Sequence, residues 1–260
     1  MQLKGKAAIV TGSTSGIGLA IATRFAAERA KVMLNGFGRP EDIERARRTV
    51  AEHGTELRYS PADMSKRDEI RAMVAEAETA FGAVDVLVNN AGIQHVAPVE
   101  DFPDEKWEQI IAINLSAAFY ATKAALPGMK KRGWGRIINI ASAHGLVASS
   151  GKAAYVAAKH GIVGLTKVTA LDHANDGITA NAICPGWVLT PLVQKQIDTR
   201  AASEKIPVKE ASEDLLREKQ PMLQFTAPED LAALAVFLCS EAAKTMTGTT
   251  HSMDGGWTAQ

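Results

Sequence analysis

The stretch AAIVTGSTSGIG at residues 7–18 joins a run of strand-type residues to a glycine-rich turn. Gly12, Gly16 and Gly18 allow the backbone to turn sharply and to approach a bound group closely. If a helix follows, its free N–H groups and positive dipole end can hold a pyrophosphate. The spacing is GxxxGxG and not GxGxxG, so a tight turn without a ligand is an alternative. The position of this turn in the first strand–helix unit favours a dinucleotide site.

The rest of the chain alternates between two hydrophobic periods. Short apolar runs occupy residues 7–11, 31–35, 84–89, 136–141 and 179–184, and the segments between them have helical spacing. The clearest helix is predicted at residues 66–81, where apolar side chains recur on one face. Strands that alternate with helices imply a parallel sheet covered on both sides. The sequence therefore predicts one doubly wound, Rossmann-type α/β domain over residues 1–260.

Composition and charge exclude several classes of protein. The 260 residues include 29 Lys and Arg and 29 Asp and Glu, so no net positive charge is available to hold a nucleic acid. Cys184 and Cys239 have no metal-binding spacing, and we expect no metal site. No apolar run approaches the roughly 18 residues that span a bilayer, and no signal-peptide core follows Met1. We therefore expect a cytoplasmic protein without a membrane or nucleic-acid partner.

Residues 186–224 form the one compositional break. These 39 residues separate a predicted strand from the next apolar segment, which is too long for an ordinary connection. Within them, residues 195–219 hold six basic and six acidic side chains, a pattern that predicts solvated helices with little core to make. A mobile helical lid fits this composition, and a plain surface excursion is the alternative.

The end of the second predicted strand bears on the choice of cofactor. NAD-selecting folds usually carry Asp or Glu about 20 residues beyond the glycines, whereas residues 34–39 read LNGFGR here. The carboxylate is missing. Arg39 is the only base close to where a 2′-phosphate would lie, and it comes about one helical turn too late. We expect NAD rather than NADP.

A serine, a tyrosine and a lysine follow the fifth predicted strand. Tyr155 and Lys159 stand four residues apart on one face of a helix, and Ser142 precedes Tyr155 by 13 residues. A phenol with a pKa of about 10 is a poor base at neutral pH, but a neighbouring ammonium favours its phenolate form. Ser142 can polarise a substrate carbonyl by a hydrogen bond. By spacing alone, a Tyr/Lys pair of this kind is more often a pair of surface residues.

Together with the glycine turn, these residues resemble the short-chain dehydrogenase/reductase family over essentially the whole chain. The shared motifs are Thr11-Gly12-(three residues)-Gly16-Ile17-Gly18, Asn89-Asn90-Ala91-Gly92, Asn114, Ser142, Tyr155-(three residues)-Lys159 and Pro185-Gly186-(three residues)-Thr190. The resemblance implies a seven-stranded parallel sheet whose last strand lies near residues 249–253.

The resemblance also implies roles for individual residues. Tyr155 would be the acid/base, and Ser142 would orient the substrate. Lys159 would bind the nicotinamide ribose and lower the tyrosine pKa, while Asn114 would hold a water in a proton relay. The implied cofactor contacts are Gly12, Ser15, Gly16, Ile17, Gly18, Phe37, Asp63, Met64, Asn90, Ala91, Gly92, Tyr155, Lys159, Pro185, Gly186, Val188 and Thr190.

The predicted substrate end is similar to the 3-hydroxybutyrate dehydrogenase branch of that family. The similarity lies in residues 91–95, 142–146, 152–155, 185–187, 196 and 255–257. It implies reversible, NAD-dependent oxidation of (R)-3-hydroxybutyrate to acetoacetate. The side chains that would recognise the carboxylate are Gln94, His144, Lys152 and Gln196, and those that would enclose the methyl group are Trp187 and Trp257. A solvated loop lysine and two core tryptophans are the alternatives.

Two helical segments carry more apolar surface than a sheet requires. Residues 114–129 and 154–174 are apolar or small nearly all round, whereas a helix that covers a sheet needs one buried face. We expect them to pair with copies of themselves across a two-fold axis. The family resemblance implies that the assembly is a homotetramer.

Two rival functions stay open. One is an NADP-dependent 3-oxoacyl or sugar reductase of the same family, in which Lys152 and His144 would be incidental. The other is a nucleotide-sensing protein that kept the fold and lost the reaction. The intact set of Ser142, Tyr155 and Lys159 disfavours the second.

Overall fold

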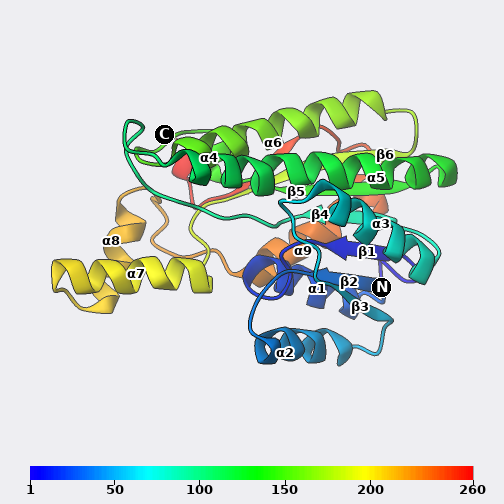
Figure 1. The fold of residues 1–260 in the computed structure, drawn as a ribbon, viewed down its shortest axis with the longest axis horizontal. Helices are drawn as coiled ribbons and strands as arrows, with labels where there is room; N and C mark the ends of the chain where they lie inside the picture. Colours follow the sequence, from blue (N-terminus) through cyan, green and yellow to red (C-terminus); the bar gives the residue numbers. More distant parts are fainter. Residues whose placement is uncertain (260) are drawn as a thin grey trace.

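The computed structural model describes residues 1–259 and has the predicted doubly wound α/β fold (Figure 1). The strands are β1 (Ala7–Val10), β2 (Lys31–Asn35), β3 (Leu57–Ser60), β4 (Val86–Asn89), β5 (Gly135–Ile140), β6 (Ile178–Pro185) and β7 (Thr250–Met253). The α-helices are α1 (Gly16–Ala27), α2 (Pro40–Ala51), α3 (Arg67–Phe81), α4 (Asp104–Ile111), α5 (Ala117–Arg132), α6 (Ala153–Asp172), α7 (Pro191–Glu204), α8 (Val208–Arg217) and α9 (Pro228–Leu238).

All seven strands are parallel and lie in the order β3-β2-β1-β4-β5-β6-β7. The order reverses direction between β1 and β4, which are hydrogen-bonded neighbours. In open parallel sheets, ligands bind at the carboxyl ends of the strands beside such a switch point. The topology therefore places the glycine turn after β1 and the asparagine motif after β4 on opposite sides of one crevice.

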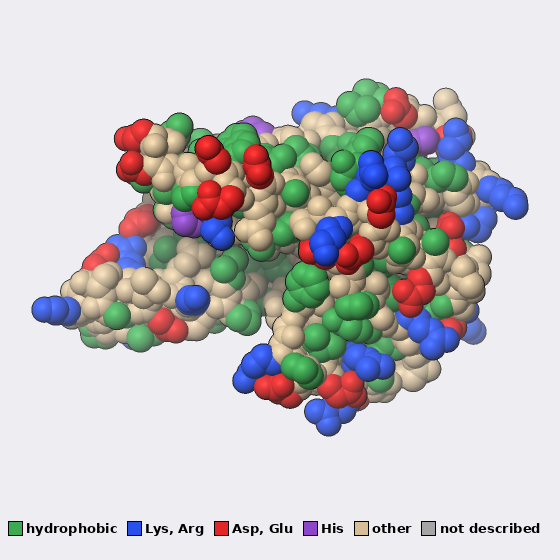
Figure 2. All heavy atoms as spheres, viewed as in Figure 1, with side chains coloured by type: hydrophobic (Ala, Val, Ile, Leu, Met, Phe, Trp, Pro, Cys, Tyr) green, Lys and Arg blue, Asp and Glu red, His purple; other side chains and the backbone are tan. Residues whose placement is uncertain are grey.

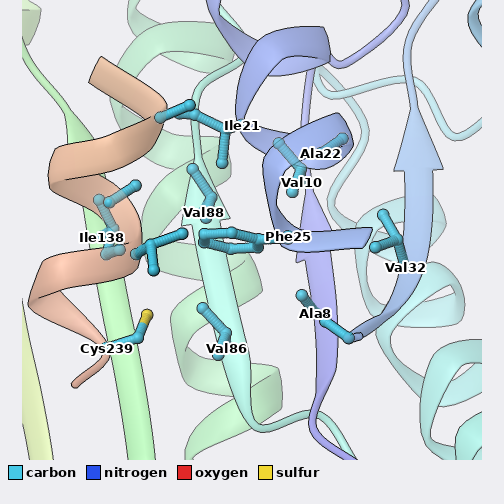
Figure 3. Packing of buried hydrophobic residues seen from close by; sticks show 14 of the residues in the cluster. Ala8, Val10, Ile21, Ala22, Phe25, Val32, Val86, Val88, Ile138 and Cys239 are labelled. Carbon is cyan, nitrogen blue, oxygen red and sulfur yellow. The ribbon is translucent and has the colours of Figure 1, made fainter. Parts of the chain in front are cut away.

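The core consists of two layers, one on each face of the sheet. Phe25 of α1 lies against the sheet next to Val86 and Val88 of β4 (Figure 3). Side chains of α9 join the same layer, while α3 and α5 cover the other face. Large apolar side chains that are fully buried contribute roughly 1.5–3 kcal/mol each. This double cover explains why the predicted strands read as continuous apolar runs.

The sequence periodicity located five strands, and two escaped it. In β3, only Ser60 of the four residues is buried, and in β7 none is. Each lies at an edge of the sheet, where one strand partner is missing. An edge strand with few buried side chains lacks the apolar run that marks a central strand. The β7 position came from the family resemblance alone, and the structure confirms it.

The expectation that no segment is long and apolar enough to span a membrane was wrong. One continuous helix runs from Asp104 to Arg132 through α4, a π-helical segment (Ala112–Ser116) and α5, and passes that test by length and composition. Its six alanines make much of it apolar without a conspicuous run of large residues. It packs on α3, α6 and the sheet, with 39% of its most apolar window buried. A core helix of a soluble protein passes the same test.

The segment at residues 186–224 forms two helices, α7 and α8, which project from the body as an arm (Figure 1). The expectation that they have little core to make was wrong. Ile197, Leu215 and Leu216 are buried in a small cluster of their own with Trp187 and Trp257. The even mixture of charges lies on the outer faces of these helices, so composition alone hid their apolar stripe.

Candidate active site

A cleft of about 460 Å³ runs along the carboxyl ends of the strands, and the arm borders it. The hollow between the arm and the body is visible in Figure 2. Every residue that the sequence nominated for catalysis, substrate or cofactor lines this cleft, with the exception of Gly18 and Asn114. The structure therefore brings residues from nearly the whole length of the chain to one place.

The glycine turn is held in place by two asparagines. Gly12 has a φ of +61°, and its N–H donates to Oδ1 of Asn35 over 3.3 Å. The side-chain amide of Asn90 donates to the carbonyls of Thr11 and Gly12, each over 2.9 Å. A Cβ on Gly12 would lie 2.8 Å from Cα of Ala91. The turn and the loop after β4 thus approach closely enough to form a narrow backbone cradle.

Gly18 lies directly behind that cradle and leaves room for it. A side chain there would collide with the Gly12 carbonyl and the Asn90 amide, so the first turn of α1 packs directly beneath the glycine turn. The N-terminus of α1 begins at Gly16 and has no side-chain cap. Its free N–H groups fit the pyrophosphate of a dinucleotide.

Among residues 1–259, no Lys or Arg side chain lines the end of the cleft that lies beside Phe37 and Asp63. Phe37 is 64% exposed, and Arg39 pairs with Glu41 and Asp42 at the start of α2. In the part of the chain that the structure describes, two Lys or Arg side chains line the cleft, namely Lys152 and Lys159. The carboxylate of Asp63 lines the cleft as well and accepts hydrogen bonds from Ser65.

Ser142, Tyr155 and Lys159 meet at the other end. Ser142 follows β5, and α6 carries Tyr155 and Lys159. The pKa of Tyr155 is raised by burial, and a hydrogen bond from Ser142 partly opposes this shift. The predicted lowering of the tyrosine pKa by Lys159 is therefore absent from the protein alone. Desolvation of the phenolate outweighs its stabilisation.

Lys159 is itself strongly affected by burial. Its Nζ donates to the carbonyl of Ile140 over 2.7 Å and lies 5.6 Å from the centre of the Tyr155 ring. Burial lowers the pKa of Lys159 to about 8. The ammonium therefore carries its charge at neutral pH, although it is held in a desolvated place.

Asn114 lies behind the cleft, in the π-helical segment. Its side chain accepts from the N–H of Ile93 and donates to the carbonyl of Ile93, both over 2.9 Å. Together with Lys159 and Thr11 it borders a separate void of about 10 Å³. A void of this size is about that of one water probe. π-helical turns occur frequently at functional sites, and this one turns Asn114 inward.

The substrate end combines a cation with aromatic walls. Nζ of Lys152 lies 5.3 Å from the ring centre of Trp187, whose ring lies 5.7 Å from that of Trp257. Burial and the charge of Lys219 lower the pKa of Lys152. Lys152 has no carboxylate within ion-pairing distance, and the buried indole N–H of Trp187 has no partner among residues 1–259. Gln94 and Gln196 line the same part of the cleft.

His144 is buried between Ser142 and the two tryptophans. Its ring makes edge contacts with Tyr155 and Trp257, at centroid distances of 5.9 and 5.0 Å. Burial and then the charge of Lys152 lower the pKa of His144 to about 4. The ring is therefore neutral at pH 7. Its two nitrogens lie near the hydroxyls of Ser142 and Ser149 rather than pointing to an open donor position.

Several residues of the site escaped sequence reasoning. Asn35 is fully buried and also donates to the carbonyls of Ser60 and Ala62. Gln220 accepts the N–H of Trp187 over 3.1 Å and anchors the end of the arm to the pocket wall. A polar residue at the end of a buried strand was a usable signal for Asn35. Nothing in the sequence marks Gln220, because its partners are distant along the chain.

The fold and these groups define a dinucleotide-dependent oxidoreductase. A family model described as enoyl-(acyl carrier protein) reductase matches residues 12–258. The chain belongs to the short-chain dehydrogenase/reductase family.

Two curated relatives are especially similar. The chain is 61% identical to a D-beta-hydroxybutyrate dehydrogenase of Cupriavidus necator, over 100% of both chains. It is 54% identical to a protein of the same name from Rhizobium meliloti, over 98% of this chain and 99% of the relative.

Solved structures of the family have the same fold. A levodione reductase superimposes with a TM-score of 0.92 at 31% identity, over 99% of both chains. An actinorhodin polyketide ketoreductase, solved with NADPH, also gives a TM-score of 0.92 at 35% identity, over 98% of both chains. The family therefore includes a member that takes a phosphorylated dinucleotide in this fold.

Proposed function

We propose that this protein catalyses the reversible, NAD-dependent oxidation of (R)-3-hydroxybutyrate to acetoacetate. The observation that carries the proposal is Lys152. Among residues 1–259 this cation has no carboxylate partner, and it lies in the same cleft as Ser142 and Tyr155 and against Trp187. A buried unpaired charge costs free energy unless a ligand neutralises it. A small hydroxy acid supplies that charge, and similarity to two D-beta-hydroxybutyrate dehydrogenases supports this substrate.

One set of cleft residues would bind the cofactor. When bound, a nicotinamide dinucleotide supplies hydride transfer to and from the substrate carbon. The glycine turn and the N-terminus of α1 would hold its pyrophosphate, and Lys159 its nicotinamide ribose. Asp63, Val188 and Thr190 line the cleft along the rest of its length.

Tyr155 takes the proton from the substrate hydroxyl during oxidation and returns it during reduction. Ser142 donates to the substrate oxygen and polarises the carbonyl. Because burial raises the pKa of Tyr155, the protein alone favours the acid form that reduction needs. Charge brought by the bound cofactor and by Lys159 would favour the phenolate that oxidation needs. Asn114 would hold a water behind Lys159 as the outer part of the proton path.

Carboxylate recognition falls to Lys152, with Gln94 and Gln196 as neutral donors. Charge-assisted hydrogen bonds contribute about 1.5–3 kcal/mol each. His144 lines the same cleft and stays a predicted member of this set, with its ring nitrogens near the hydroxyls of Ser142 and Ser149. Trp187 and Trp257 leave an apolar wall suited to the methyl group.

NAD is favoured over NADP by the adenosine end. A 2′-phosphate there would meet the exposed ring of Phe37, and Arg39 is already paired with two carboxylates. A phosphate without a cation loses the charge-assisted bonds that normally select it. This supports NAD even though residues 34–39 contain no acidic side chain.

Three broader features belong to the same proposal. Residues 186–224 act as a lid that closes over the substrate in an otherwise single domain. The exposed apolar residues Phe119 of α5 and Val168 and Leu171 of α6 lie in a homotetramer interface. The protein works in the cytoplasm. Proteolysis with and without ligands, ultracentrifugation and cell fractionation test these in turn.

The central test is a panel of initial rates, followed by the absorbance of reduced nicotinamide. We expect the highest kcat/KM with (R)-3-hydroxybutyrate and NAD, and a large loss with the methyl ester of the same acid or with NADP. Equal rates on acid and ester would contradict the carboxylate assignment. Preference for NADP with a 3-oxoacyl substrate or a sugar would favour the rival reductase. Cofactor binding without turnover of any alcohol would favour a nucleotide sensor.

A further inference from the structure

Gln220 is a buried glutamine that has no part in the proposed mechanism. It follows the end of α8, at the base of the arm, and only 1% of it is exposed. Oε1 of its amide accepts the backbone N–H of Trp187 over 3.1 Å, and Nε2 donates to the carbonyl of Gln224. Both partners are backbone groups with fixed donor and acceptor roles, so the orientation of the amide is determined. The arm, the loop after β6 and the segment before α9 therefore meet at one side chain.

Two glycines leave room for this side chain. A Cβ on Gly186 would lie 2.7 Å from Oε1 of Gln220, and a Cβ on Gly255 would lie 2.5 Å from its Cγ. Gly255 also has a φ of +57°, a conformation that favours glycine. The side chain of Gln220 thus fills the space between the end of β6 and the turn after β7.

Each glycine is close in the chain to a tryptophan of the predicted pocket wall. Trp187 follows Gly186 directly, and Trp257 comes two residues after Gly255. The two indole rings lie 5.7 Å apart and belong to one apolar cluster. Because Gln220 lies between the two backbone segments that carry these rings, it fixes the distance between them. Its removal would leave the buried N–H of Trp187 without an acceptor and would let both segments shift.

We propose that Gln220 is a positioning residue that selects substrates by size. It holds Trp187 and Trp257 at a spacing that suits the methyl group of 3-hydroxybutyrate and disfavours longer acyl chains. The selection by size rests on the proposed function, whereas the placement of the two tryptophans does not. Among residues 1–259, Gln220 is not one of those that line the cleft, so it acts only through the two segments that it separates.

The placement of the tryptophans can be measured without a substrate. With 5-fluorotryptophan at its four tryptophan positions, the protein should give one ¹⁹F resonance for each, and Trp187→Phe and Trp257→Phe identify two of them. Gln220→Met keeps the length of the side chain and removes both hydrogen bonds. In this variant we expect the Trp187 and Trp257 resonances to move by more than a linewidth, while those of Trp107 and Trp134 stay in place. Gln220→Glu retains an oxygen for the N–H of Trp187 and should move them less.

Gln224→Met is the matched control. The side chain of Gln224 is exposed, and its carbonyl, which accepts from Gln220, is unchanged by the substitution. All four resonances should therefore keep their positions. Unchanged Trp187 and Trp257 resonances in both Gln220 variants, or equal shifts in Gln224→Met, would overturn the proposal. Thermal unfolding is measured first, and Gln220→Glu, which has the shape of the native side chain, carries the tests if Gln220→Met does not fold.

Kinetics test the selection by size. The two substrates are (R)-3-hydroxybutyrate and (R)-3-hydroxypentanoate, which differ by one methylene. The ratio of their kcat/KM values should fall about 3- to 10-fold in Gln220→Met, because a wall that can shift discriminates less against a methylene. The ratio should stay the same in Gln224→Met.

A lowering of both kcat/KM values by the same factor would show a merely structural role for Gln220 and would overturn the selection by size. If neither acid is oxidised, the proposed function has failed. The same ratio is then measured with the alcohol that the protein oxidises fastest and its next longer homologue. The fluorine spectra, which need no substrate, decide separately whether Gln220 places the two tryptophans.

Discussion

The two ends of the cleft are built in different ways. At the nucleotide end, backbone atoms of Gly12 and the loop after β4 form the cradle, and the buried side chains of Asn35 and Asn90 hold it. At the predicted substrate end, side chains form the walls, and they come from the loops after β4, β5 and β6, the start of α6, the arm and the C-terminal segment. The substrate end even has its own small core around Trp187 and Trp257.

The difference has a functional consequence. The nucleotide end is fixed by the sheet, so it cannot change without disturbing the central strands. The substrate end lies on loops and on the arm, around a small apolar cluster of its own, so its side chains can change while the sheet stays intact. This is consistent with a family in which one fold carries many substrates. It also predicts that substitutions at the two ends affect different kinetic constants.

Tyr155→Phe should give the largest effect. It should abolish most turnover while leaving binding at both ends of the cleft intact. We expect kcat to fall on the order of 1000-fold, because only the oxygen that transfers the proton is lost. The dissociation constant of NADH, from fluorescence titration, should stay within about threefold, since the ring remains. Turnover within tenfold of the unmodified protein would remove Tyr155 from the acid/base role.

Gly12→Ala should break the nucleotide end alone. The added Cβ would lie 2.8 Å from Cα of Ala91, and the residue has a φ of +61°. Since backbone cannot yield as a flexible side chain does, we expect cofactor affinity to fall about 100-fold. At saturating cofactor, the preference for acid over neutral substrate should persist.

Gly5→Ala is the matched control for this variant. Gly5 has a φ of +79°, but no atom lies within 4 Å of the position of its Cβ. This variant should suffer the backbone strain without the collision. Calorimetric cofactor affinities that fall equally in both variants would contradict the steric account of the cradle.

Lys152→Ala should break the substrate end alone. Loss of one charge-assisted hydrogen bond, about 1.5–3 kcal/mol, should lower kcat/KM for 3-hydroxybutyrate roughly 10- to 100-fold. The methyl ester should lose little, and cofactor affinity should stay the same. Lys167→Ala, at an exposed position of α6, the helix that Lys152 immediately precedes, is the control. Equal losses on acid and ester would mean that Lys152 supports the catalytic geometry instead.

The same contrast explains what could be predicted from the sequence. The nucleotide end obeys local rules, because glycines, a strand and a helix follow one another within residues 7–18. Continuous apolar runs predict the central strands, whereas β3 and β7 at the edges of the sheet have no such run. At the substrate end, residue types and the family resemblance pointed to six side chains, and all six line the cleft.

The sequence could not predict which side chains are hydrogen-bond partners in the site. Gln220 meets Trp187 across 33 residues, and the partner of each His144 nitrogen depends on the turn after β5. The rise in the pKa of Tyr155 in the protein alone also could not be predicted from spacing, because it depends on how deeply the phenol is buried. Such facts depend on tertiary contacts and solvent exclusion, which periodicity and spacing do not encode.

Arg200→Gln should give the smallest effect and tests whether the arm acts as a unit. Arg200 of α7 pairs with Glu218, just beyond α8, over 2.6 Å, and so joins the two helices of the arm. Exposed ion pairs contribute about 0–1 kcal/mol. We therefore expect KM for 3-hydroxybutyrate to rise only about two- to fivefold, with cofactor constants unchanged.

Arg217→Gln is the matched control. It removes pairs that lie within α8, to Glu213 and Asp214, and should leave KM unchanged. Added salt should raise KM of the unmodified protein toward that of Arg200→Gln, because salt screens the same pair. If both arginine variants changed KM equally, the general charge of the arm would matter, and the link between α7 and the end of α8 would have no special part in binding.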